Sequence, residues 1–384
     1  MNETVALVPC SGYGEKEVVG AIRQAVDYLG GWGQYVKPGQ RVLLKANLLT
    51  KRPPEDAVTT HPLVVKAVAA EVIRAGGKPV IYDSPGGPFT TAILEDIYRV
   101  SGLTQVARET GAELNWDVAG TQVSAPEEAR ERSFTLSQAV CNADVVINLP
   151  KLKSHGLTRY TGAVKNLYGC IPGLHKAEYH LQLPELHKFV GFLLDLALTV
   201  RPALTIVDAV VGMEGEGPSA GTPRPLGYLL ASPSVFALDA VAVTLIGLNL
   251  DEVPSTNLAA KRGLLARSVD DIVVGSALRE AIVSDFEVPP PGGTSFRLLG
   301  YRMPPRLLKL AGGLLGARPV FRAEQCRRCG ICIRSCPAKA ITLADRRPTV
   351  DLKKCIRCFC CQELCPEQAV TIHRSWLSRR FLRS

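Results

Sequence analysis

The sequence of 384 residues lacks a long uninterrupted apolar run, the feature by which membrane-spanning helices and export signals are recognised. Its first ten residues, MNETVALVPC, contain neither a basic cluster nor a long apolar stretch, so we expect no signal peptide. The most apolar stretch, residues 226–250, is interrupted by Pro233 and Asp239. It predicts a buried strand followed by a core helix rather than a membrane span.

Two nucleotide-binding fingerprints are also missing. No G-x-G-x-x-G run of the flavin or nicotinamide type is visible. Residues 212–221 (GMEGEGPSAG) are rich in glycine, but no Gly-Lys-Ser/Thr follows them, so they are not a Walker loop. They predict either a lid or backbone that wraps a ligand, or a plain flexible turn.

Cysteine, by contrast, is concentrated near the C-terminus. Residues 326–336 and 355–365 share the spacing C-x2-C-x2-C-x3-C followed by proline, which is the ligand pattern of cubane iron–sulfur clusters. In two-cluster ferredoxins the fourth cysteine of each run binds the other cluster. The spacing therefore predicts two [4Fe–4S] clusters, one held by Cys326, Cys329, Cys332 and Cys365 and the other by Cys355, Cys358, Cys361 and Cys336.

Disulfides and zinc are the other uses of closely spaced cysteines. Disulfides are not expected in a chain without a secretory segment, and zinc usually takes four ligands in two pairs rather than two quartets followed by proline. Cys360, beside Cys361, is surplus to the pattern, and is either a packed thiol or a substitute ligand. Because cluster-binding thiols favour a reducing compartment, we expect a cytoplasmic protein.

The first 300 residues predict an α/β fold. Apolar runs at residues 4–9, 41–46, 78–82 and 144–149 alternate with helical patterns that include residues 15–29 and 63–75. This alternation indicates a mostly parallel sheet covered by helices on both faces. We expect the body at residues 1–300, a linker with an amphipathic segment at 301–320, a small α+β ferredoxin-like two-cluster domain at 321–375 and a basic tail at 376–384.

Polar residues gather at the predicted strand ends, where ligands bind in such sheets. Lys45 and Asn47 follow the second strand, and Asp83 follows the third. The glycine-containing stretch 148–180 begins at the end of the fourth strand and carries Lys151, Lys153, His155, Lys165 and Asn166. These residues predict a site for an anionic small molecule, with Lys153, His155 and Asp83 as candidate catalytic groups and Lys45, Asn47, Lys151, Lys165 and Asn166 as candidate substrate-binding groups. The alternatives are a solvated basic loop, or a metal site at His175 and His180 near Cys170.

Charge is unevenly placed along the chain. From Tyr301 onward 18 Lys and Arg stand against 5 Asp and Glu, whereas the preceding 300 residues hold 27 against 31. The basic end predicts contact with a redox partner protein that is acidic, or is itself a ferredoxin or a reductase, or contact with the body. We do not expect peripheral contact with an anionic membrane, and we expect no nucleic-acid partner because no nucleic-acid fold is recognisable.

Several short segments, taken together, resemble the domain-of-unknown-function 362 family. They are residues 45–47 (KAN), 59–62 (TTHP), 82–86 (YDSPG), 150–155 (PKLKSH), 162–169 (GAVKNLYG), 207–208 (VD), 214–218 (EGEGP) and 237–240 (ALDA). Members of this family often carry a C-terminal two-cluster ferredoxin domain, and residues 355–366 (CIRCFCCQELCP) resemble theirs. The resemblance supports grouping the polar residues into one site, but it implies no substrate.

Two functions fit these features best. The first is a ferredoxin-coupled oxidoreductase, in which the clusters supply electrons to an anionic small molecule bound in the body. The second is a dedicated electron carrier whose body only docks a partner, and a third use of the clusters is structural or sensory. We favour the first, because a polar site at strand ends is joined covalently to an electron supply.

Overall fold

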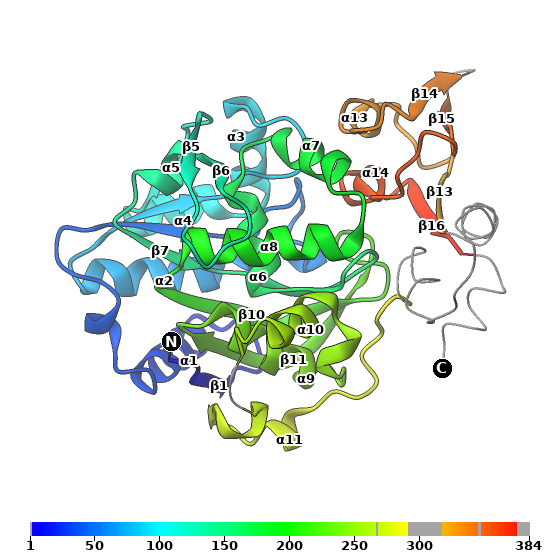
Figure 1. Ribbon diagram of the computed structural model, residues 1–384. Coiled ribbons are helices and arrows are strands. Elements are labelled where there is room, and N and C mark those ends of the chain that lie inside the picture. Colours follow the sequence, from blue (N-terminus) through cyan, green and yellow to red (C-terminus); the bar gives the residue numbers. More distant parts are fainter. Residues whose placement is uncertain (1, 266–267, 291–316, 345–346, 375–384) are drawn as a thin grey trace.

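The computed structural model describes residues 2–265, 268–290, 317–344 and 347–374. The predicted basic tail at 376–384 lies outside these ranges, as does the predicted linker at 301–320 up to residue 316. The described residues form an α/β body, coloured blue to yellow in Figure 1, and a small C-terminal module, coloured orange to red.

The body is organised around one mixed, mostly parallel sheet, which has ten strands in the described part of the chain. Across the sheet the strands are ordered β12 (Val273–Gly275), β1 (Val5–Pro9), β11 (Thr222–Ser232), β10 (Leu204–Glu214), β7 (Val145–Asn148), β2 (Arg41–Lys45), β3 (Lys78–Tyr82) and β4 (Glu113–Leu114). Within this order β11 runs antiparallel to both neighbours, and the other neighbouring pairs are parallel. The prediction of a mostly parallel sheet is confirmed.

Helices cover both faces of the sheet. Successive side chains of a strand point to opposite faces, so the buried strands contribute side chains to two apolar cores. In β1, Val5 and Leu7 belong to one apolar core, whereas Ala6 and Val8 belong to the other. The first core includes residues of α6 (Ala163–Asn166), α8 (Leu186–Val200), α9 (Val235–Leu245), α10 (Pro254–Lys261), α11 (Leu278–Ala281), the hairpin β5 (Gly120–Ser124)–β6 (Ser133–Ser137) and α5 (Gln138–Cys141). The second core includes residues of α1 (Glu15–Asp27), α2 (Pro62–Arg74), α3 (Thr91–Val100) and α4 (Leu103–Thr110).

Local capping signals set where the helices begin. Helix α2 begins at Pro62, whose fixed φ suits a first helical turn, and the Leu63 amide donates to His61 Nδ1 at 3.2 Å. Helix α9 begins after Ser234, whose Oγ accepts the Ala237 amide at 3.2 Å. Together β11 and α9 confirm the predicted order of a strand and then a helix within residues 226–250.

The alternative interpretation of residues 148–180 as a solvated basic loop is wrong. These residues form β8 (Lys151–His155), β9 (Arg159–Thr161), α6, the 3-10 turn η3 (Leu167–Cys170) and α7 (His175–Gln182). Strand β8 pairs with β10 and β9, and all five of its residues are buried. Charged side chains are tolerated in a buried strand only where polar partners meet them. In β8 those partners come from distant parts of the sequence, so its polar composition concealed the strand.

The C-terminal module combines short strands and helices, as predicted. Strand β13 (Arg318–Phe321) pairs with β16 (Val370–His373), and β14 (Ile341–Ala344) pairs with β15 (Arg347–Val350). Helices α13 (Ile331–Arg334) and α14 (Cys360–Glu363) lie within the two cysteine runs. Figure 1 shows the module against the body beside α7. Among the described residues, no helix combines the length and the apolar character needed to cross a membrane.

Candidate functional site

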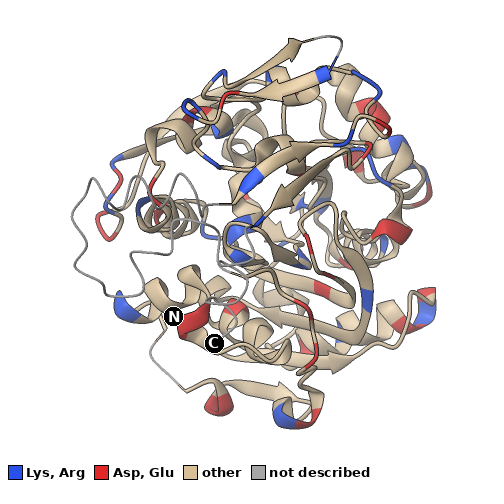
Figure 2. Cartoon of the chain, turned by 90° about the vertical axis from the view of Figure 1, so that its right-hand side faces the viewer, with Lys and Arg blue, Asp and Glu red and all other residues tan. Residues whose placement is uncertain are grey.

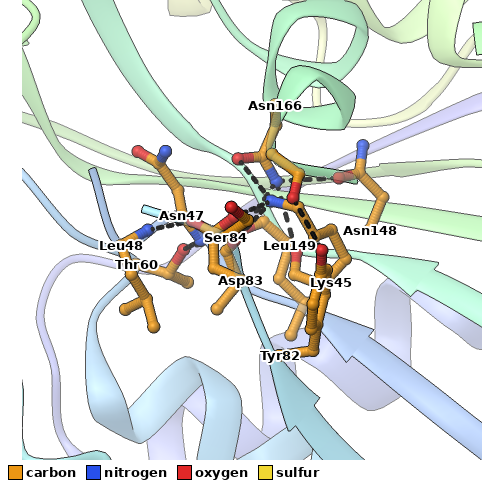
Figure 3. A network of polar contacts seen from close by, with 12 residues as sticks. Lys45, Asn47, Leu48, Thr60, Tyr82, Asp83, Ser84, Asn148, Leu149 and Asn166 are labelled. Atoms are coloured by element: carbon orange, nitrogen blue, oxygen red, sulfur yellow. Dashed lines mark hydrogen bonds and ion pairs between the residues drawn. The ribbon is translucent and has the colours of Figure 1, made fainter. Parts of the chain in front are cut away.

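A buried ion pair lies where the parallel strands β2 and β3 end. Lys45 is the last residue of β2 and Asp83 follows β3, and Lys45 Nζ lies 2.8 Å from Asp83 Oδ1 (Figure 3). Asp83 Oδ2 also accepts the Leu48 amide at 2.6 Å. A Cβ at Gly169 would lie 2.1 Å from Asp83 Oδ1, so only glycine lets the backbone approach this pair. The carboxylate and the ammonium therefore neutralise one another.

Two asparagines surround this pair. Asn166, on α6, donates to Asn148 Oδ1 at 2.8 Å and accepts from Lys45 Nζ at 3.4 Å. The Asn47 amide donates to Thr60 Oγ1 at 2.8 Å, but the buried Asn47 Oδ1 has no partner among the described residues. The structure thus brings Lys45, Asn47, Asp83 and Asn166 together, as predicted from their positions at strand ends, while their roles stay predictions.

Asp239, on α9, anchors the short helix that carries Lys165 and Asn166. Its carboxylate accepts the Tyr160 hydroxyl at 2.9 Å and the Ala163 and Val164 amides at 2.6 and 2.9 Å. Burial raises its pKa to about 6, so the group remains mostly ionised at neutral pH. The acid inside the apolar stretch is therefore satisfied by three donors and positions α6.

Replacing Asp239 by asparagine is expected to lower the free energy of unfolding by about 2–4 kcal/mol, because a buried amide group replaces an acceptor that holds three donors. Urea unfolding followed by circular dichroism measures the change. The matched control is Asp251→Asn at an exposed position, which is expected to change stability by less than about 0.5 kcal/mol. Equal stability of the two variants would show that Asp239 does not anchor α6.

Lys151 lies in a different network from the other predicted site residues. Its Nζ lies 2.9 Å from Asp208 Oδ2 and donates to the Tyr13 hydroxyl at 2.6 Å. The Tyr13 ring stacks on His61 with centroids 3.5 Å apart. Lys151 does not line the pocket described next, so the structure does not bring this predicted substrate-binding residue to it.

A pocket of about 790 Å³, including the part that opens to solvent, lies between the strand ends and the C-terminal module. Three lysines line it. Lys153 Nζ donates to Val58 O at 2.8 Å, and Lys176 Nζ donates to Ser84 O and Ile171 O, both at 2.9 Å. The Lys165 ammonium makes no hydrogen bond or ion pair with another described residue. No lysine of the three is bonded to a carboxylate, so the lysines give the pocket lining an excess of positive groups over its carboxylates.

Lys153 and Lys176 are only partly protonated at neutral pH when no anion is bound. Burial, together with the nearby Lys165 and Lys151, lowers the pKa of Lys153 to about 7. Burial of the Lys176 ammonium lowers its pKa to about 7 as well. A bound anion would favour the protonated form of both groups. Lys176 was not among the predicted site residues.

His155 lies behind the pocket rather than in its lining. Its Nδ1 accepts the Leu157 and Thr158 amides at 3.0 and 3.4 Å, which leaves the ring proton on Nε2. Nε2 lies 3.2 Å from Oε1 of Glu363, a residue of the module. Burial lowers the pKa of His155 to about 4, with Lys165 adding to the effect, so the ring is neutral at pH 7.

Glu363 is the functional candidate that the sequence did not reveal. It lies on α14, its side chain is 10% exposed, and it lines the pocket together with the three lysines. Burial opposes its ionisation, but His155 and Lys165 outweigh burial and lower its pKa. The available signal was an acidic residue inside a cluster-binding run, between Cys361 and Cys365.

The glycine-rich turn at residues 215–221 holds the module in place. Gln362 Nε2 donates to Glu216 O at 3.0 Å, and Gln368 Nε2 donates to Ser219 O at 3.3 Å. Arg374 forms an ion pair with the Glu216 carboxylate. On the other side of the pocket a Cβ at Gly86 would lie 2.0 Å from a methyl carbon of Leu364, so the module packs closely there too. For residues 212–221 the sequence predicts either a lid or backbone that wraps a ligand, or a plain flexible turn. In the structure residues 215–221 contact the module, and Pro218 lines the pocket.

The cysteines of the module surround two cavities. One is lined by Cys326, Cys329, Cys332 and Cys365, and the other by Cys336, Cys355, Cys358 and Cys361, so each contains three cysteines of one run and the fourth of the other. None of these eight cysteines forms a disulfide. A cubane cluster needs four thiolates around a cavity, and both sets fit that requirement. Cys360 reaches both the second cavity and the pocket.

A single-ion metal site is not supported in the described part of the chain. No three His, Cys, Asp or Glu side chains there are arranged to hold one metal ion. His175 is exposed and lies 2.9 Å from Glu178, whereas His180 packs against Tyr168 and Phe189. The metal alternative considered for His175 and His180 is therefore wrong.

These features define an iron–sulfur protein of the ferredoxin type that is joined to an α/β body. A model of the 4Fe-4S dicluster domain matches residues 318–366, which confirms iron–sulfur binding by the module. A model of the domain of unknown function DUF362 matches residues 42–244, which include the strand ends and the lysines of the pocket. The chain belongs to the DUF362 family.

Two further proteins are similar to the chain. A thylakoid-associated protein of Synechocystis sp. is 36% identical over 290 residues, which are 75% of this chain and 88% of the relative. The lactate racemase apoprotein from Thermoanaerobacterium thermosaccharolyticum aligns with a TM-score of 0.37 and 12% identity, over 61% of this chain and 56% of that chain. This chain therefore matches little more than half of the racemase, and so weak a likeness carries no conclusion about function.

Proposed function

We propose that this iron–sulfur electron-transfer protein is a ferredoxin-coupled oxidoreductase that acts on an anionic small molecule in the pocket. The observation that supports this most directly is the position of α14. This helix carries the cysteine ligand Cys361, and its residues Cys360 and Glu363 line the same pocket as the lysines. One short helix therefore carries a ligand of the electron supply and part of the pocket lining.

We assign two [4Fe–4S] clusters to the module, held by Cys326, Cys329, Cys332 and Cys365 and by Cys336, Cys355, Cys358 and Cys361. When bound, such clusters supply single electrons at potentials set by their surroundings. The second set lies against the body, since the cavity next to it is lined by Cys358 and Phe359 together with His180 and Phe189 of the body. The cavity of the first set is lined by module residues alone.

The body residues would bind the anion, orient it and move protons. Lys165 would bind the anion by charge, and Lys153 and Lys176, whose pKa values lie near 7, are suited to give or take a proton during turnover. Asp83 would act by orienting Lys45 and the Leu48 amide. His155 would act by orienting Glu363, because its ring does not reach the pocket.

We further propose that an acidic redox protein, or a ferredoxin or reductase, supplies the electrons at the basic module. The described residues of the module include 11 Lys and Arg against 4 Asp and Glu, which favours encounter with an acidic surface. On the face that carries the module, blue and red segments are interspersed rather than forming one basic surface (Figure 2). We propose the cytoplasm as the compartment, and the thylakoid association named for the relative leaves contact with a membrane surface as the alternative.

The test uses the full-length protein with reconstituted clusters, reduced with dithionite under anaerobic conditions. Small anions that can accept two electrons and two protons, such as 2-oxo and unsaturated carboxylates, are added one at a time as the oxidant, and reoxidation of the clusters is followed by visible absorption. We expect at least one anion to accelerate reoxidation, and Lys165→Ala to slow that reaction by about tenfold or more, because it removes a pocket charge. Lys78→Ala, at an exposed position, is the control and should have no effect.

The same experiment separates the two functions considered from the sequence. A dedicated carrier would reduce an acceptor protein equally well with and without Lys165, and no small anion would accelerate reoxidation. That combined outcome would replace the enzyme proposal with the carrier.

A further inference from the structure

We propose that the pocket selects a small dianion that also carries a hydroxyl or amino group, and that Glu363 of the module sets the preferred charge. This proposal rests on the proposed function, because it concerns the same pocket, and it names the class of molecule bound there.

The charges that line the pocket support a dianion. Three ammonium groups line it, those of Lys153, Lys165 and Lys176. The Asp83 carboxylate does not reduce their sum, because Lys45 pairs with it at 2.8 Å. Glu363 is the one carboxylate in the lining that lacks a paired lysine or arginine among the described residues. When a bound anion keeps all three lysines protonated, three positive groups and one negative group leave two positive charges for the ligand to match.

The histidines near the pocket do not change the net charge of its lining. The His155 ring faces Glu363 and is neutral, because its Nδ1 accepts two backbone amides. His180 is buried between the rings of Tyr168 and Phe189 and lacks a carboxylate partner among the described residues. Neither ring is placed to carry a stable positive charge at neutral pH.

Two residues of the pocket lining carry an unsatisfied polar atom, which supports a ligand that also forms hydrogen bonds. Asn47 of the body and Ser335 of the module line the pocket, and their Oδ1 and Oγ atoms are buried without a partner among the described residues. A buried acceptor without a donor costs free energy, so a ligand that brings a hydroxyl or amino group would be favoured. A hydrocarbon dianion would leave Asn47 Oδ1 unsatisfied.

Glu363 belongs to the module, so the pocket has this charge balance only when the module is seated. The seating contacts are those of Gln362 with Glu216, Gln368 with Ser219 and Leu364 with Gly86. The body alone would present three ammonium groups without the opposing carboxylate. The module therefore contributes to ligand choice as well as to electron supply.

Four probes test the proposal by isothermal titration calorimetry on the full-length protein with its clusters. Glycolate, malate and citrate carry one, two and three charges and all have a hydroxyl group, whereas succinate carries two charges and lacks one. We expect the wild-type protein to bind malate about tenfold or more tightly than glycolate, citrate or succinate. In Glu363→Gln the preference should move by one charge, so that citrate gains about tenfold relative to malate.

Controls keep a failure of folding apart from a failure of the proposal. Glutamine has nearly the shape of glutamate, and unchanged iron content and visible absorption would show that the module is intact in Glu363→Gln. Glu178→Gln, exposed on α7 and outside the pocket lining, should keep the wild-type order of affinities. The charge of a bound cluster is the same in every variant, so it cancels when the affinity for one anion is compared between variants.

The outcomes separate this inference from the proposed function. Binding of none of the anions by any variant would overturn both. Binding in the same order by the wild type and Glu363→Gln, or a wild-type preference for a singly or triply charged probe, would overturn the charge assignment and leave an anion-binding enzyme. Equal affinity for malate and succinate would overturn the requirement for a hydroxyl group.

Discussion

Substituting both Cys326 and Cys365 by serine is expected to leave the protein with about half of its iron, the same content as either single variant. Substituting both Cys326 and Cys355 is expected to remove nearly all of it. The reason is spatial, because Cys365 lines the cavity of Cys326 and not that of its own sequence neighbours Cys358 and Cys361. A lost thiolate leaves a cubane with three ligands, so each set fails as a unit.

Iron analysis and electron paramagnetic resonance of the dithionite-reduced variants measure this effect. A protein with two reduced clusters should show magnetic coupling between them, and the Cys326/Cys365 variant should show one uncoupled signal. Cys141→Ser, exposed at the end of α5, is the control and should retain full iron. Complete loss of iron from the Cys326/Cys365 variant, with half retained after loss of Cys326 and Cys336, would show that each run binds its own cluster.

Affinity for an anion such as malate is expected to be nearly constant below pH 7 and to fall above it, by up to about tenfold per pH unit for each of two lysines. In the empty pocket Lys153 and Lys176 have pKa values of about 7, since burial disfavours their charged forms. A bound anion raises both pKa values. Above pH 7 the free protein loses protons that the complex keeps, so binding must take them up from solution.

The expected pH dependence of the affinity takes into account the charged groups around Lys153 and Lys176. Lys165 and Lys151 oppose the charge of Lys153, and the more distant carboxylates Glu363 and Asp83 favour it. Lys176 is surrounded by Asp83, Lys45 and the Cys170 thiol. Because these pKa values lie below the usual 10.5, the unfolded chain holds more protons than the folded protein between pH 7 and 10.5. The contribution of these lysines to stability therefore rises with pH across that window.

Calorimetry from pH 6 to 9, in two buffers with different ionisation enthalpies, measures both the affinity and the proton uptake. Lys153→Met should halve the slope of log affinity against pH and reduce the uptake by about one proton. Lys78→Met, exposed at the start of β3, is the control and should keep the wild-type slope. An affinity that stays flat to pH 9 would contradict the role of Lys153 and Lys176.

The strands show how far local sequence predicts this fold. Residues 41–46, 78–82 and 144–149 read as apolar runs, and they form β2, β3 and β7 because a strand buried on both faces needs apolar side chains on both. An apolar run does not mark strand β8, because Lys151, Lys153 and His155 lie in this strand and are buried. Their partners Asp208, Val58 and Glu363 are far away in sequence, and a local pattern carries no information about them.

In the site, too, some residues could be placed from the local sequence, and others only from contacts between remote segments. Lys45 and Asp83 were recognised from their places at strand ends, because parallel strands bring those ends to one edge. Lys151 and Lys153 lie two residues apart on β8, yet Lys151 pairs with Asp208 and Lys153 reaches the pocket. The register of β8 against β10 is irregular between these two residues, and only the folded chain decides where each ammonium group lies.

By itself the sequence determined the chemistry of the cofactor, because the spacing of cysteines along the chain controls how a short loop wraps a cluster. It also determined the mostly parallel sheet, because burial on both faces imposes a local apolar pattern. Only the tertiary structure decided which lysines share a pocket and which acid faces them. Glu363 lies far from Lys153, Lys165 and Lys176 in the sequence, and it meets them because the module docks on the residue 215–221 turn and on Gly86. Electrostatic interactions depend on distance in space, which contacts between remote segments set.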